Sequence, residues 1–171
     1  ELRKNQLKAI IKSIDNDFSS GIHYHATGSG KSWIAIYILQ EFNKRYPKSN
    51  VLWVCERKDI LNHQFNKNTL KERGFKDIIN KYNILNFVEN KHNEWYDSLN
   101  SSKFWGKPYL CIMNRCFLTS QKKYKKIKNP IHLVIHDECH SIENKTTQEF
   151  YNWLSNINDI KFKIKTRVIG F

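Results

Sequence analysis

Residues 23–36 read HYHATGSGKSWIAI, and this stretch decides which fold we expect the chain to adopt. A short apolar run leads into a Gly-Ser-Gly bend at residues 28–30, and a longer apolar run opens at Lys31. Glycine lets the backbone turn sharply, so the bend separates two elements of regular structure. The sequence predicts a strand at 22–26, then the bend, then a largely buried helix that ends before Pro47.

Further apolar runs, each bounded by turn residues, predict the elements on both sides of this bend. The expected helices cover residues 2–14, 58–73 and 146–154, and the expected strands cover 51–56, 109–113, 131–138 and 167–171, with 82–88 compatible with one more. The strands are continuous apolar runs that do not alternate with polar residues. This pattern is typical of an α/β fold whose mostly parallel sheet carries helices on both faces. The polar stretch 89–108 is expected to be a surface excursion.

The composition limits the classes of protein that are compatible with the chain. Its 171 residues suffice for one domain, and 29 Lys and Arg against 16 Asp and Glu give a net charge of +13. Such an excess attracts polyanions such as nucleic acids, although the codon usage of an A+T-rich genome explains it equally well. Four cysteines without a CxxC pair predict neither a zinc site nor a disulfide framework. With no long apolar run or leader, we expect a soluble intracellular protein, cytoplasmic, nuclear or viral, without a membrane partner.

The bend has the chemistry of a phosphate-binding loop. Residues 25–32 fit the pattern G-x-x-x-x-G-K-[ST], except that His25 stands in place of the first glycine. In such a loop the backbone N–H groups surround an anion, the lysine reaches the β- and γ-phosphates, and the hydroxyl is a ligand of Mg²⁺. The candidate residues of the loop are Thr27, Gly28, Ser29, Gly30, Lys31 and Ser32.

A second candidate site follows the apolar run at residues 133–136. Asp137 and Glu138 come directly after this run, where Asp137 can hold Mg²⁺ through water and Glu138 can deprotonate a water aimed at the γ-phosphate. An isolated Asp-Glu pair is more often a solvated acidic turn. Together with the loop, however, the pair supplies lysine, hydroxyl, metal carboxylate and base, which predicts an NTPase.

The two motifs resemble those of a known group of enzymes. ATGSGKS at 26–32 and DECH at 137–140 resemble motifs I and II of superfamily 2 helicases, in which the loop commonly lacks the first glycine. The resemblance implies a RecA-like lobe that uses ATP and Mg²⁺, with Lys31, Asp137 and Glu138 as catalytic residues. It also implies that His140 links the γ-phosphate to the grip on nucleic acid, although a histidine at a strand end is as often a packed polar residue.

Two more segments extend the resemblance. LRKNQLKAI at 2–10 resembles the Leu-Arg-x-x-Gln segment of the branch that contains DEAH-type helicases and the motors of type I and type III restriction enzymes. This implies that Gln6 reads the adenine edge, with Arg3 in support; as plain surface residues of a helix they would carry no role. VLWVCERKDILNHQ at 51–64 is similar to motif Ia, which makes Arg57 a candidate contact to a nucleic-acid phosphate.

The resemblance implies an ATP-dependent nucleic-acid helicase or translocase. Its partners would be DNA or RNA and a second RecA-like lobe that supplies arginines for hydrolysis. We expect residues 1–171 to be the N-terminal ATP-binding domain of a longer protein, to stop before motif III, and to turn ATP over slowly alone. The alternatives are an NTPase that acts on another substrate, and a nucleic-acid sensor or scaffold without efficient turnover.

Other polar and aromatic residues are ambiguous in the sequence. A basic stretch at 122–128 surrounds Tyr124 and is either a solvated loop, which we favour, or a surface for phosphates and a stacked base. Trp95, Tyr96 and Trp105 are expected to cover the core rather than to stack on bases. His23, His25 and His136 lack metal-ligand spacing and are interpreted as structural.

Overall fold

The computed structural model describes residues 3–23, 31–56, 65, 67–102, 106–137 and 142–171, and of Lys31 and Ser32 it describes the backbone alone. In the described part of the chain, six strands form one sheet in the order β1-β6-β5-β2-β4-β3, and all neighbouring strands in it are parallel. The predicted parallel α/β sheet is therefore confirmed. Its strands are β1 (Gly21–Ile22), β2 (Val51–Cys55), β3 (Asn83–Asn86), β4 (Tyr109–Asn114), β5 (Leu133–His136) and β6 (Arg167–Gly170).

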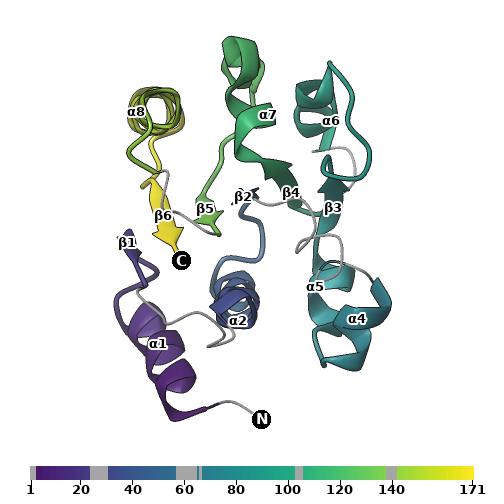
Figure 1. Cartoon of the computed structure of the whole chain (residues 1–171), viewed down its shortest axis with the longest axis vertical. Coiled ribbons are helices and arrows are strands. Elements are labelled where there is room, and N and C mark those ends of the chain that lie inside the picture. The colour runs from purple at the N-terminus through teal and green to yellow at the C-terminus, as the bar shows by residue number, and fades with distance from the viewer. Residues whose placement is uncertain (1–2, 24–30, 57–64, 66, 103–105, 138–141) are drawn as a thin grey trace.

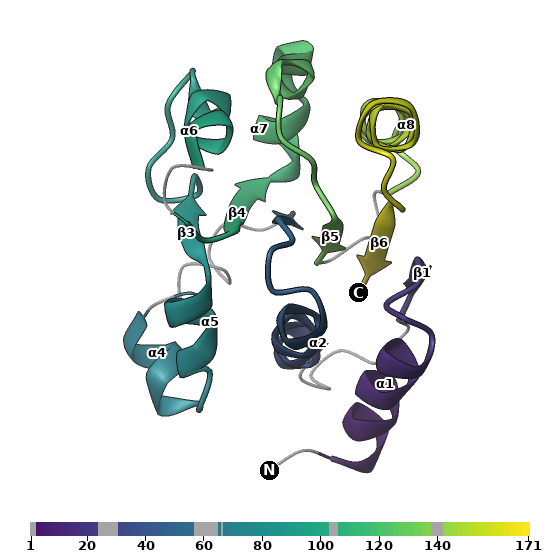
Figure 2. The same ribbon diagram turned by 180° about the vertical axis from the view of Figure 1, so that it is seen from behind.

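Helices cover both faces of this sheet, as Figures 1 and 2 show from opposite sides. One layer holds α1 (Lys4–Asp15), α2 (Lys31–Arg45), α4 (Lys67–Glu72) and α5 (Lys76–Lys81), and we call its side of the sheet the α2 face. The other layer, on the α8 face, holds α6 (Trp95–Ser101), α7 (Arg115–Thr119), the 3-10 segment η2 (Ser120–Lys126), α8 (Lys145–Ile157) and the π-helical turn η4 (Asn158–Phe162).

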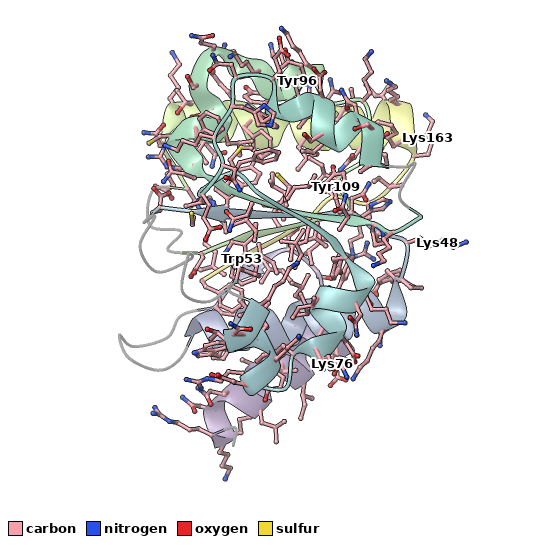
Figure 3. All side chains as sticks on the ribbon, turned by 90° about the vertical axis from the view of Figure 1, so that its right-hand side faces the viewer. Lys48, Trp53, Lys76, Tyr96, Tyr109 and Lys163 are labelled. Atoms are coloured by element: carbon pink, nitrogen blue, oxygen red, sulfur yellow. The ribbon has the colours of Figure 1, made fainter. Side chains whose placement is uncertain are left out.

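Two separate hydrophobic cores result, because successive side chains of a strand point to opposite faces of the sheet. In β2, Val51, Trp53 and Cys55 pack against the α2 face, while Leu52 and Val54 join the core beneath the α8 face. Figure 3 shows Trp53 on the side of Lys76 and Tyr109 on the side of Tyr96. All the central strands are buried on both faces, which explains their continuous apolar sequences.

Asn50 fixes the three central strands where they begin. Its amide nitrogen donates to the Pro130 carbonyl at 3.0 Å, its side-chain oxygen accepts from the Tyr109 N–H at 3.1 Å, and its own backbone N–H donates to His132 Nδ1 at 2.9 Å. Asn50 thus fixes how β5, β2 and β4 are aligned along their length at the points where they begin.

The predicted helix at 2–14 is confirmed, but its buried face differs from the prediction. In the sequence, the spacing of Leu2, Leu7, Ile10, Ile11 and Ile14 predicts that these residues share one apolar face. Ala9 and Ile10 are buried, whereas Leu7 and Ile11 are each 47% exposed. The helix lies at the outer side of α2, so its neighbour covers only a narrow stripe of it.

The polar stretch 89–108 is more than the predicted surface excursion. It contains α6, in which Trp95 and Leu99 lie one helical turn apart and are both buried under the α8 face. Trp95 therefore covers the core, as expected, and Tyr96 packs at the edge of its ring at a centroid distance of 5.9 Å. Trp105 lies outside the described residues.

The basic stretch 122–128 proves to be a solvated surface anchored by two core residues, Tyr124 and Ile127. Tyr124 is 1% exposed and packs edge-on against Phe150 with ring centroids 5.0 Å apart, so the alternative of a base-stacking tyrosine is wrong. Lys122, Lys125 and Lys126 are exposed, and Lys122 pairs with Glu149.

The last part of the helix predicted at 58–73 is described as α4, which ends at Glu72. Gly74 follows two residues later with φ +84°. The predicted stop at Gly74 is confirmed. None of the helices that the structure describes is both long enough and apolar enough to cross a membrane.

Candidate functional site

The exits of β1 and β5 lie at the same edge of the sheet. Both strands run parallel to β6, which lies between them. Since neighbouring strands are about 4.8 Å apart, the two exits are separated by roughly 10 Å. Main-chain hydrogen bonds continue beyond the strands, from the His23 N–H to the Gly170 carbonyl at 2.8 Å and from the Phe171 N–H to the His136 carbonyl at 3.0 Å. This carboxyl-terminal edge is where open α/β sheets bind their ligands.

Helix α2 begins with Lys31 and is suited to receive an anion at its N-terminus. It is 15 residues long and carries no acidic side chain in its first turn, so nothing there offsets the positive end of the helix dipole. Thr27, Gly28, Ser29 and Gly30, which are expected to complete the loop, lie outside the described residues. The side chains of Lys31 and Ser32 are likewise not described.

Asp137 follows β5 at the same edge. It is 3% exposed, and its backbone N–H donates to the Val54 carbonyl at 2.8 Å, which fixes the main chain just beyond the strand. Burial, and then the negative charges of Asp137 and Glu56, raise the pKa of the Cys55 thiol to about 12. Cys55 belongs to the core of the α2 face, so the Asp137 carboxylate adds negative potential beside the layer that contains α2.

This donor set fits a magnesium nucleotide. Mg²⁺ prefers oxygen ligands and is commonly held by one or two carboxylates together with substrate phosphates, rather than by a full cage of side chains. A buried carboxylate directly after β5 and a helix that follows the exit of β1 can supply these two requirements. Within the described ranges, no group of three or more His, Cys, Asp and Glu side chains gathers to hold a metal ion.

Gln6 and Arg3 lie at the start of α1. Gln6 is buried, and its side-chain oxygen accepts from the Arg3 N–H at 2.9 Å, so the side chain is oriented by the first turn of its own helix. The Arg3 side chain is exposed. Their assignment to adenine recognition stays a prediction, as do those of Arg57, Glu138 and His140, which lie outside the described residues.

A polar cluster that the sequence did not predict lies on the α8 face of the same edge. Arg115 Nε donates to Glu56 Oε1 at 2.8 Å and to Oε2 at 2.9 Å, and His136 Nε2 lies 3.2 Å from Oε1. His136 Nδ1 lies 2.8 Å from the Tyr151 hydroxyl of α8. We call Glu56, Arg115, His136 and Tyr151 the Glu56 cluster.

Of the three histidines that were predicted to be structural, the structure describes His23 and His136, and both have packing contacts. His136 is fully buried within the Glu56 cluster, and the His23 ring stacks on Phe171 at a centroid distance of 5.0 Å and an interplanar angle of 8°. The second contact ties the exit of β1 to that of β6. His25 lies outside the described residues.

Solved structures with the same fold define the class of protein. The chain superimposes with a TM-score of 0.61 on the Type ISP restriction-modification enzyme LlaGI, solved as a nuclease-deletion mutant with a DNA substrate mimic, at 15% identity over 100% of this chain and 17% of that one. The TM-score is also 0.61 for the Sulfolobus solfataricus SWI2/SNF2 ATPase core solved with dsDNA, at 16% identity over 99% of this chain and 31% of that one. The fold is therefore that of a RecA-like lobe.

The family follows from the sequence itself. Residues 1–171 match the family model described as type III restriction enzyme, res subunit. The chain belongs to this family, which confirms the resemblance to restriction-enzyme motors, and it spans less than a third of the length of each of the two solved relatives. Among curated proteins, none matches the chain significantly.

Proposed function

We propose that the chain is the ATP-binding lobe of an ATP-dependent DNA helicase or translocase. Family membership and the two solved relatives, one in complex with a DNA substrate mimic and the other with dsDNA, support double-stranded DNA as the substrate. The observation that carries the proposal is the shared carboxyl-terminal edge at which β1 and β5 end, with buried Asp137 directly after β5 and with α2 following β1 and leading back to the start of β2. Residues 1–171 would form the N-terminal lobe, and a second lobe would complete the cleft.

Each candidate residue has a role in this proposal. The backbone of residues 27–30 would hold the phosphates, with Lys31 on the β- and γ-phosphates and Ser32 and Asp137 as ligands of Mg²⁺, partly through water. When bound, Mg²⁺ would offset the negative charge of the phosphates. Glu138 would take the proton of the attacking water.

The remaining residues would bind the base and the DNA. Gln6 can donate and accept at once, which suits the N6 and N7 edge of adenine, and Arg3 would support it. Arg57 would contact a phosphate of the DNA backbone, and His140 would link the γ-phosphate to the DNA-binding residues.

The test uses the full-length gene product and measures ATP hydrolysis with and without double-stranded DNA. We expect DNA to stimulate hydrolysis, Lys31→Ala to abolish the heat of ATP binding, and Glu138→Gln to retain binding while hydrolysis falls at least about 100-fold. Lys44→Ala is the matched control, because Lys44 lies in the last turn of the same helix and pairs with Glu41.

Other outcomes would identify a different function. Stimulation by RNA but not by DNA would move the substrate to RNA, and hydrolysis that no nucleic acid stimulates would favour an NTPase with another substrate. Unchanged activity in Glu138→Gln would favour a sensor or scaffold that does not depend on turnover.

A further inference from the structure

The Glu56 cluster connects three strand exits that are far apart in the sequence. Glu56 follows β2, Arg115 follows β4, and His136 is the last residue of β5. The side chains of Arg115 and Glu56 are only 14% and 13% exposed. A carboxylate that accepts from one guanidinium nitrogen through both oxygens, with little water around it, has a narrowly defined geometry. The three exits are therefore held in a fixed relation to one another.

Two of these three strand ends are followed directly by a candidate functional residue. His136 precedes Asp137, the candidate carboxylate for Mg²⁺, and Glu56 precedes Arg57, the candidate contact to DNA. His136 joins Glu56 on the α8 face, where it contacts Tyr151 of α8, and the alternation of strand side chains between faces assigns the next residue to the α2 face. Glu56 therefore contacts His136, the residue before the candidate Mg²⁺ ligand Asp137. In the sequence, Glu56 also comes directly before Arg57, the candidate contact to DNA.

The charge of Arg115 is committed to the protein rather than presented to a ligand. Besides the two bonds from Nε to Glu56, Nη1 lies 3.4 Å from Thr147 Oγ1 and Nη2 lies 3.6 Å from Cys116 Sγ. The Asn114 side chain supports the same arrangement, since its nitrogen donates to the Glu56 carbonyl at 3.2 Å and its oxygen caps α7 at the Cys116 N–H. Arg115 therefore holds Glu56 and is not itself the contact to a phosphate.

We infer that Glu56 is a positioning residue that couples the nucleotide site to the DNA-binding site, by tying the exit of β5 to the exit of β2. The inference rests on the proposed function. A displacement of the β5 exit when nucleotide binds would pass through His136 and Glu56 to the residue that contacts DNA. Such coupling is reciprocal, so each ligand changes the affinity for the other by the same factor.

The experiment measures this factor directly by binding, without turnover. The Kd of the full-length gene product for a fluorescein-labelled DNA duplex is determined by anisotropy, in the presence and absence of a non-hydrolysable ATP analogue with Mg²⁺. In the wild-type protein we expect the two Kd values to differ at least fivefold. In Glu56→Gln, which keeps the shape but removes the charge, we expect them to agree within about twofold.

A second variant separates positioning from a purely structural role. Glu56→Gln alone leaves the buried Arg115 charge without its carboxylate and can unfold the protein, whereas Glu56→Gln with Arg115→Met removes both charges together. We expect this double variant to melt near the wild-type temperature and still to lack coupling. Recovery of coupling along with the fold would overturn the inference.

Asp17→Asn is the matched control. It removes the carboxylate that pairs with Arg167, whose Nη2 lies 2.9 Å from Asp17 Oδ2. Arg167 is the first residue of β6, so this ion pair lies at the amino-terminal ends of the strands, away from the Glu56 cluster. We expect its coupling factor to equal that of the wild-type protein.

The salt dependence of DNA binding tests the role assigned to Arg115. We expect the double variant to keep the wild-type slope of log Kd against log salt, whereas loss of a phosphate contact would reduce that slope by about one. A reduced slope would overturn the assignment of Arg115 to positioning. A wild-type protein that binds neither ligand would overturn the proposed function and the inference with it, while coupling that survives in Glu56→Gln would overturn the inference alone.

Discussion

Arg115 Nε donates to both carboxylate oxygens of Glu56, at 2.8 and 2.9 Å, and so joins the end of β4 to the end of β2. Because both side chains are largely buried, removal of one partner leaves a charge that water cannot solvate.

We therefore expect Arg115→Met to lower the free energy of unfolding by about 3–5 kcal/mol, measured by urea denaturation. Lys44→Met is the control, because Lys44 pairs with Glu41 at 2.9 Å on the surface and should lose less than about 1 kcal/mol. Equal losses in the two variants would show that burial does not strengthen the Arg115 pair.

Gly74 gives a second prediction, which concerns the backbone alone. Its φ of +84° disfavours any side chain, while among the described residues no atom beyond its two chain neighbours lies within 4 Å of the position that a Cβ would occupy. We expect Gly74→Ala to destabilise the chain by about 1–2 kcal/mol through strain. Gly21 also has open space around it but no such φ, so Gly21→Ala should leave the unfolding midpoint almost unchanged.

Asp17 makes stability depend on pH in the acid range. The Tyr46 hydroxyl donates to Asp17 Oδ1 at 2.5 Å. This hydrogen bond is the largest cause that lowers the pKa of the Asp17 carboxyl from its ordinary 3.8 to about 2. Burial raises this pKa, whereas Arg167 and Arg45 lower it further. Because the pKa is lower in the folded state, the stabilisation is present above about pH 4 and is lost as the pH falls toward 2.

We expect Tyr46→Phe to move this loss of stability to higher pH, since the main cause of the low pKa is removed. The measurement is the unfolding midpoint between pH 2 and pH 6. Tyr37→Phe removes a hydroxyl from α2, the helix that ends just before Tyr46, and should leave the profile in place because Tyr37 does not contact Asp17. Identical profiles for all three proteins would contradict the role of Tyr46.

Tyr124 tests whether the basic stretch is anchored by a core residue. Its ring packs against Phe150 and, at a centroid distance of 5.2 Å, against Trp153. We expect Tyr124→Ala to cost about 3–5 kcal/mol in thermal or chemical denaturation. Lys125→Ala, a change of an exposed neighbour, should stay within about 0.5 kcal/mol of the wild-type protein. Tyr124→Ala that remained as stable would contradict the buried position.

Much of the fold could be predicted because its central strands must be apolar on both faces. The runs at 51–55, 109–113 and 133–136 admit no other placement than the middle of a covered parallel sheet, and the family resemblance rested on motifs at two of the strand exits. Helix α6 was missed because only Trp95 and Leu99 carry its helical spacing within a polar stretch.

The Glu56 cluster could not be predicted, since its members meet only through the strand order β5-β2-β4. In the sequence, Glu56, Arg115 and His136 are three unrelated polar residues that each follow or end an apolar run. The roles assigned to Lys31, Ser32, Asp137, Glu138, Gln6, Arg57 and His140 remain predictions for the experiments above.

Strand β1 has a consequence for how the protein is made. It is the outermost strand of the described sheet and pairs with β6, in which Ile169 lies opposite Gly21 and Gly170 lies opposite Ile22. During translation, β1 therefore cannot pair with β6 until nearly all of the 171 residues have left the ribosome. A nascent chain that is stalled before residue 167 should lack a docked β1, so β1 would be among the last of the described strands to join the sheet.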